Sequence, residues 1–164
     1  MEDKQLKQAL ISLLGRNARI STGELAARLD VPEKEVERAI GELERDKTIL
    51  GSTAVINDEA LSGEVRAIIE VEVQPERDTG FDNIARRLAM FPEVRSLYLV
   101  SGKYDLRLEI IGKSLQDVAS FVAGKLASQD GVKSTATYFM LKKYKESGVQ
   151  FSSEEKHERL KIVP

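Results

Sequence analysis

The hydrophobic residues of this chain change their spacing across the polar segment 57–64. Before it, apolar side chains recur every three to four positions, as on one face of a helix. After it, the run Ala67, Ile69, Val71 and Val73 alternates with other residues, which is typical of a strand with one buried face. The polar segment together with this change of spacing predicts two unlike domains joined by a linker.

Residues 1–56 predict a small helical domain. Ser21 followed by Glu24 forms a capping box that begins one helix. Pro32 suits the first turn of the next helix. All four tyrosines and all five phenylalanines lie later in the chain, so this domain packs with aliphatic side chains alone. Three helices followed by an extended segment, Ile49–Ile56, predict a winged helix-turn-helix.

Residues 65–145 predict strands and helices in the order βαββαβ, an α+β domain of the ferredoxin-like class. Helical spacing runs from Phe81 to Phe91 and again after Ser114. The two helices of such a domain cover only one face of its sheet. Strands are expected from Ala67 to Val73 and over 94–100, 104–111 and 132–143. Residues 146–164 are expected to form a tail.

Tyr98, Tyr138 and Met140 are expected on the open face of this sheet. Exposed apolar surface of this kind favours pairing with a second copy of the chain.

Several residue types needed for catalysis are scarce. The chain has no cysteine and one histidine, His157, so neither a cysteine nucleophile nor a histidine metal cluster is available. No glycine pattern of a phosphate or dinucleotide loop occurs. These observations favour a binding protein without a cofactor or metal over an enzyme.

No apolar run approaches the roughly 20 residues that span a bilayer. The N-terminus is not a signal peptide. A cytoplasmic protein without a membrane partner is therefore expected.

The stretch Val100–Leu108 predicts a hairpin whose turn is suited to ligand binding. The turn amides of Ser101, Gly102, Lys103 and Tyr104 would meet a carboxylate, and the side chain of Asp105 would meet an ammonium group. A structural interpretation stays open, in which Gly102 supplies a positive φ and Asp105 fixes the loop.

The last predicted strand begins with hydroxyl residues that could face the same pocket. These are Ser134, Thr135 and Thr137. Threonine in a strand needs no function, so a purely structural role is the alternative.

Three segments carry a resemblance to a known family. They are residues 44–51 after the third helix, the hairpin 100–108, and Gly131-Val132 before the last strand. In this order the chain resembles the Lrp/AsnC, or feast/famine, transcriptional regulators over residues 3–145. The resemblance implies amino-acid-responsive control, double-stranded DNA as a partner, and homodimers formed by the C-terminal sheets, often assembled into octamers. It also implies effector binding between dimers near the hairpin.

The third helix departs from the family's pattern of paired basic residues. Between residues 33 and 46, three bases stand against six acids, a sum of −3. Lys34 and Arg38 are expected to face away from the core and to reach the major groove. Thr22, Arg45 and Thr53 are candidates for contacts to DNA phosphates, and the alternative for each is an ordinary surface residue. Because acids repel phosphates, the alternative is a sensor or scaffold of the same architecture without DNA binding.

Overall fold

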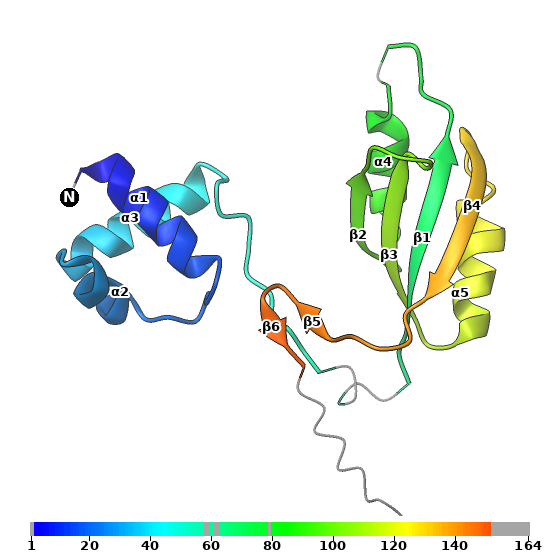
Figure 1. Cartoon of the computed structure of the whole chain (residues 1–164). Coiled ribbons are helices and arrows are strands. Elements are labelled where there is room, and N and C mark those ends of the chain that lie inside the picture. The colour runs from blue at the N-terminus through cyan, green and yellow to red at the C-terminus, as the bar shows by residue number, and fades with distance from the viewer. Residues whose placement is uncertain (1, 58–59, 61–62, 79, 152–164) are drawn as a thin grey trace, which may run out of the picture. The chain divides into compact units, whose positions relative to one another are not determined.

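The computed structural model describes residues 2–57, 60, 63–78 and 80–151. The chain divides into two compact units, Met1–Ile56 with Lys145–Pro164, and Asn57–Tyr144. Figure 1 shows the elements of both units. Four residues of the predicted linker and most of the predicted tail, including His157, lie outside the described residues, so the extent of these segments stays a prediction.

The helical unit contains α1 (Asp3–Leu14), α2 (Thr22–Leu29) and α3 (Glu33–Arg45). The predicted cap of α2 is present, because Ser21 Oγ accepts a hydrogen bond from the Glu24 backbone N–H at 3.1 Å. The core is aliphatic, as the sequence predicts. Its buried members are Leu6, Leu10, Leu25, Ala26, Val36, Ala39 and Leu43.

The strand expected over Ile49–Ile56 is not formed, which corrects the prediction of a wing strand. Residues 50–57 carry no regular secondary structure, and only Val55 among them is half-buried. The side chain of Leu50 is 85% exposed. An extended segment becomes a strand only when a neighbour pairs with its backbone groups, and a local pattern of apolar residues does not supply that neighbour.

The second unit has the predicted order of elements. They are β1 (Val65–Val73), α4 (Asp82–Ala89), β2 (Val94–Leu99), β3 (Leu106–Gly112), α5 (Leu115–Phe121) and β4 (Val132–Phe139). The π-helix η2 (Val122–Leu126) continues α5. All strand pairs are antiparallel, in the sheet order β2-β3-β1-β4. The ferredoxin-like class predicted from the sequence is therefore confirmed.

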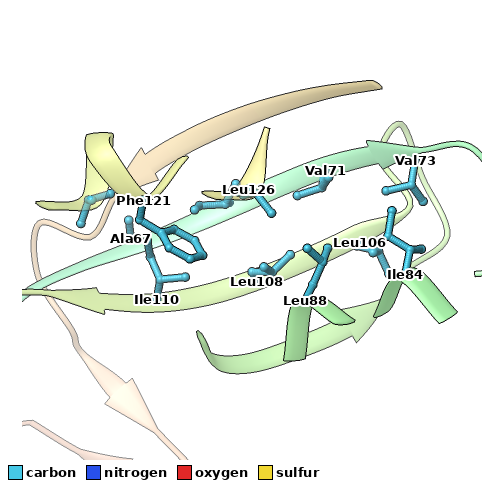
Figure 2. Close-up of a cluster of buried hydrophobic side chains, with 12 residues drawn as sticks. Ala67, Val71, Val73, Ile84, Leu88, Leu106, Leu108, Ile110, Phe121 and Leu126 are labelled. Carbon is cyan, nitrogen blue, oxygen red and sulfur yellow. The ribbon is translucent and has the colours of Figure 1, made fainter. Parts of the chain in front are cut away.

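One face of the sheet packs on the helices and forms the core of this unit. Figure 2 shows Ile84 and Leu88 of α4, with Phe121 and Leu126, meeting the side chains of β1 and β3. The contributing strand residues are Ala67, Ile69, Val71, Val73, Leu106, Leu108 and Ile110. Because side chains alternate along a strand, the residues between them lie on the other face, which no helix of this unit covers.

A short hairpin follows the sheet where the sequence predicted a tail. It consists of β5 (Lys145–Glu146) and β6 (Val149–Gln150). Ser147 and Gly148 form its turn with φ values of 48° and 84°, as a two-residue hairpin turn requires. The strand expected over 132–143 ends earlier, at Phe139. None of the helices in the described ranges is both long and apolar enough to cross a membrane.

Candidate nucleic-acid interface and effector site

The turn between α2 and α3 is tight and is fastened by side chains. Asp30 ends α2 in the left-handed conformation, with φ 52°. The Val31 N–H donates to the Ala26 carbonyl at 3.2 Å. Thr22 Oγ1 donates to Glu33 Oε1 at 2.5 Å, which links the start of α2 to the start of α3. These contacts hold the two helices as one helix-turn-helix.

The bases of α3 form one line on its surface. With 100° between successive residues, positions 34, 38, 41 and 45 lie opposite the buried Val36, Ala39 and Leu43. Lys34, Arg38 and Arg45 are exposed, and we call these three residues the basic stripe. The five acids of α3 lie on the two flanks of the basic stripe. The helix therefore has a net charge of −2 and still presents a line of cations to solvent.

Arg38 is engaged by carboxylates of two helices. Its Nη2 lies 2.7 Å from Asp3 Oδ1 in α1, and its Nη1 lies 2.8 Å from Glu42 Oε1 one turn along α3. Lys7 Nζ joins the same acids, at 2.7 Å from Glu42 Oε2 and 3.1 Å from Asp3 Oδ2. We call these four residues the α1–α3 network. Its charges sum to zero.

The α1–α3 network lowers the pKa of both of its acids. Hydrogen bonds from Arg38 and then Lys7 hold the pKa of Asp3 below its ordinary 3.8. Hydrogen bonds from Lys7 and then Arg38 hold the pKa of Glu42 below its ordinary 4.5. The same hydrogen bonds raise the pKa of Lys7 and of Arg38.

The two threonines expected at DNA phosphates have different surroundings. The hydroxyl hydrogen of Thr22 is donated to Glu33, so a phosphate has to displace that carboxylate. Thr53 is exposed on the segment after α3. Both assignments stay predictions, as do those of the three bases.

The hairpin loop differs from the tight turn that the sequence predicted. Residues 101–105 lie outside both strands, as a series of bends. Gly102 does not adopt a φ between +20° and +160°, and a Cβ added there would meet no atom within 4 Å. The expectation that this turn needs a glycine at a positive φ is therefore wrong. Ser101, Gly102 and Lys103 are exposed, and Lys103 Nζ lies 5.3 Å from the centre of the Tyr104 ring.

Asp105 is tied to the backbone of β1. Its Oδ2 accepts a hydrogen bond from the Val73 N–H at 2.9 Å, and its own N–H donates to the Val71 carbonyl at 3.1 Å. Both contacts fix the end of the loop against the sheet. This geometry favours the structural interpretation of Asp105 over that of a free ligand carboxylate.

The open face of the sheet carries a polar cluster that the sequence analysis did not predict. Tyr138 Oη donates to Glu70 Oε2 at 3.3 Å, and Ser134 Oγ donates to Glu72 Oε2 at 3.1 Å. Glu70 and Glu72 occupy the polar positions of the alternating run in β1, and that alternation was the available signal. The residues of this polar cluster are Glu70, Glu72, Ser134 and Tyr138.

The hairpin loop acts electrostatically on this cluster. The pKa of Tyr138 is raised above 10.0, chiefly by the negative charge of Glu70 and then by desolvation. The Tyr104 phenol also raises the pKa of Tyr138, while the charge of Lys103 lowers it. The loop also lies beside the polar cluster in the structure, because Asp105 bonds to Val71 and Val73 of β1, on either side of Glu72.

The three hydroxyl residues of β4 do not share one face. Ser134 and Tyr138 lie on the open face, since they pair with Glu72 and Ile68 of β1. Thr135 and Thr137 pair with the buried Val71 and Ile69, so they lie on the helix-covered face. Of the three, only Ser134 shares a face with the polar cluster, because adjacent residues of a strand point to opposite faces. The effector role of these three residues stays a prediction.

In a chain without cysteine, aspartate, glutamate and histidine side chains are the ones that could hold a metal ion. Within residues 2–57, 60, 63–78 and 80–151, no group of three or more such side chains is arranged to hold a metal ion.

Two protein families match this chain. Residues 66–150 match the family described as the Lrp/AsnC ligand binding domain. Residues 3–49 match the family described as winged helix-turn-helix DNA-binding. The first match covers the four-stranded sheet, its helices and the hairpin β5–β6, and the second covers α1, α2 and α3.

Similar proteins occur in bacteria and archaea. The HTH-type transcriptional regulator YugG of Bacillus subtilis is 40% identical over 157 residues, covering 94% of this chain and 95% of the relative. The HTH-type transcriptional regulator PH0140 of Pyrococcus horikoshii is 32% identical over 137 residues, covering 84% and 85%.

Solved structures share the fold at lower identity. The transcriptional regulator NMB0573 of Neisseria meningitidis, solved as an L-Met complex, has a TM-score of 0.69 at 23% identity, covering 87% of this chain and 92% of that one. AsnC of E. coli has a TM-score of 0.65 at 20% identity, covering 85% and 92%.

Proposed function

This chain belongs to the Lrp/AsnC family of DNA-binding transcriptional regulators, and from that premise we propose how it contacts DNA, effector and a second copy of itself. Its helical unit reads a duplex with α3. Its sheet unit binds an amino acid as a small effector and pairs with a second copy. The basic stripe is the observation that supports DNA contact by α3. Its three cationic side chains lie on the side of the helix opposite the core of the helix-turn-helix.

DNA contact falls mainly to the two ends of the basic stripe. Lys34 and Arg45 lie eleven residues apart on the same line of α3, and both are exposed. A helix inserted in the major groove presents such a line to bases and phosphates. The hydroxyl groups of Thr22 and Thr53 add phosphate contacts that position the protein without reading sequence, that of Thr22 once a phosphate has displaced Glu33.

Salt dependence tests this assignment. Each phosphate contact contributes about 0.9 to the slope of log affinity against log salt. Lys34→Gln and Arg45→Gln should therefore each weaken binding to a labelled duplex of mixed sequence and flatten the slope by about 0.9 per bound helical unit. Lys4→Gln, a change to an exposed cation of α1, is the matched control. If the variant that combines Lys34→Gln and Arg45→Gln keeps the wild-type slope, Lys34 and Arg45 do not belong to the DNA interface.

The effector is an amino acid received between the hairpin loop and the polar cluster. The exposed amides of Ser101, Gly102 and Lys103 suit a carboxylate, while Glu70 and Glu72 suit an ammonium group. Tyr104 and Ser134 lie beside these groups, and Asp105 holds the loop. The L-Met complex of the Neisseria meningitidis protein supports this class of ligand.

A thermal-shift screen of the twenty amino acids tests the effector. Ligand that binds only the native state raises the melting temperature, by about 2.7 kcal/mol of added stability at 100 times the dissociation constant. The shift should be lost in Glu70→Gln combined with Glu72→Gln. If none of the twenty amino acids raises the melting temperature of the wild-type chain, an amino-acid effector is refuted.

A further inference from the structure

Arg38 occupies the middle of the basic stripe, yet its charge is already matched. Both of its terminal nitrogens face carboxylate oxygens, at 2.7 Å from Asp3 and 2.8 Å from Glu42. Arginine binds a phosphate or a guanine through its two terminal nitrogens. In Arg38 both of these nitrogens are already bonded to the two acids. Among the described residues, Lys34 and Arg45 have no carboxylate within ion-pair distance.

The two acids are themselves held in place. Lys7 lies within 3.1 Å of Asp3 and 2.7 Å of Glu42, so it fixes both carboxylates beside Arg38. The side chains of Lys7 and Glu42 are each 25% exposed, half the exposure of Arg38 at 49%. A phosphate approaching Arg38 thus meets two anchored negative charges, which repel it, as well as an occupied guanidinium.

We propose that Asp3 and Glu42 are positioning residues that withdraw Arg38 from the duplex, so that α3 contacts DNA through Lys34 and Arg45. The proposal rests on the DNA interface proposed above. It gives Arg38 the role of tying α1 to α3. It also gives the acids of α3 a role in limiting phosphate contacts, which reduces the sequence-independent part of DNA affinity.

Asp3→Asn is the informative change, because it removes the carboxylate from Nη2 of Arg38 and leaves only Glu42 on Nη1, while keeping the size of the side chain. Affinity for a labelled mixed-sequence duplex should rise, and the salt slope between about 50 and 200 mM should steepen by about 0.9 per bound helical unit. The thermal stability of the helical unit should fall at the same time. A purely structural tie predicts instead that affinity and stability fall together.

Three variants serve as controls. Glu2→Gln removes the neighbouring negative charge, whose side chain makes no capping bond, and it should leave the salt slope unchanged. Arg38→Gln should also keep the wild-type slope, and adding it to Asp3→Asn should abolish the gain. Glu42→Gln repeats the test with α1 unaltered, and the amide NMR spectrum of α1–α3 checks the fold of each variant.

Two results would overturn the proposal. One is an Asp3→Asn variant that is folded and keeps the wild-type slope; the other is an Arg38→Gln variant whose slope flattens by about 0.9. A wild-type chain that binds no duplex even at low salt would contradict the proposed DNA interface itself, so the two failures are distinguishable.

Discussion

At the scale of single residues, Asp105 connects the hairpin loop to the central part of the sheet. Its carboxylate accepts the Val73 N–H at 2.9 Å, and Val73 is only 2% exposed. Without this acceptor, the Val73 N–H is buried and unpaired, and a buried unpaired group is costly.

Asp105→Ala should therefore lower the free energy of unfolding by about 1–3 kcal/mol, measured by urea denaturation. Asp105→Asn keeps an acceptor oxygen and should cost much less. If the two variants are equally unstable, the hydrogen bond to Val73 is not the reason for the loss. If Asp105→Asn is stable but loses the effector-induced shift, the carboxylate itself contacts the ligand.

Tyr138 reports on the electrostatics of the open face. Because Glu70 disfavours the phenolate, Glu70→Gln should lower the pKa of Tyr138 toward 10.0. NMR of ring-labelled tyrosines during an alkaline titration would resolve Tyr138 from the other tyrosines. Glu72→Gln is the control, since Glu72 bonds to Ser134. Equal shifts in both variants would argue against a specific Glu70–Tyr138 pair.

At the scale of elements, α1 and α3 are joined by ion pairs that depend on ionised acids. The folded pKa values of Asp3 and Glu42 lie below the ordinary 3.8 and 4.5, so the unfolded chain binds more protons in acid. The stabilisation is complete above the ordinary values. It is lost as the pH falls through the lowered ones.

The helical unit should accordingly lose stability in acid, below pH 4.5 and further below pH 3.8. Denaturant titrations followed by the amide NMR signals of α1–α3 would measure this decline. It should be shallower in Glu42→Gln, which lacks one of the two titrating acids. Glu37→Gln, a change to an exposed acid of the same helix, is the control. The same decline in the Glu42 variant as in the wild type would exclude the α1–α3 network as the cause.

At the scale of the whole molecule, the open face of the sheet is the surface through which we expect two copies to pair. Its exposed aromatic residues are Tyr98, 51% exposed, and Tyr138, 52% exposed. Ile68 lies between them at the level of Tyr138, on the strand β1. Pairing would place two helical units on one duplex, so that a roughly palindromic site is expected.

Ile68→Glu should therefore shift the chain from dimer to monomer, because it buries a negative charge at the interface beside Glu109, the partner of residue 68 on β3. Sedimentation equilibrium measures this change. Ala119→Lys, on the exposed side of α5, should leave the assembly as it is. A wild-type chain that is monomeric at all concentrations would refute the pairing.

The order of elements was predictable because the period of apolar residues is a local property. The alternation along β1 predicted which of its faces is buried, and Ser21 with Glu24 predicted the start of α2. The segment after Ile49 shows the limit of such patterns. Its apolar residues are compatible with a strand, but whether a strand forms depends on a neighbouring backbone.

Family membership and the division into a helical and a sheet unit were thus contained in the sequence alone. The ion pair of Arg38 with Asp3 could not be predicted from the sequence. Asp3 is 35 residues away, and only the packing of α1 on α3 brings the two side chains to 2.7 Å. The polar cluster likewise depends on β1 and β4 being neighbours in the sheet. Tertiary structure decided both, because the charge a side chain presents depends on groups that folding places beside it.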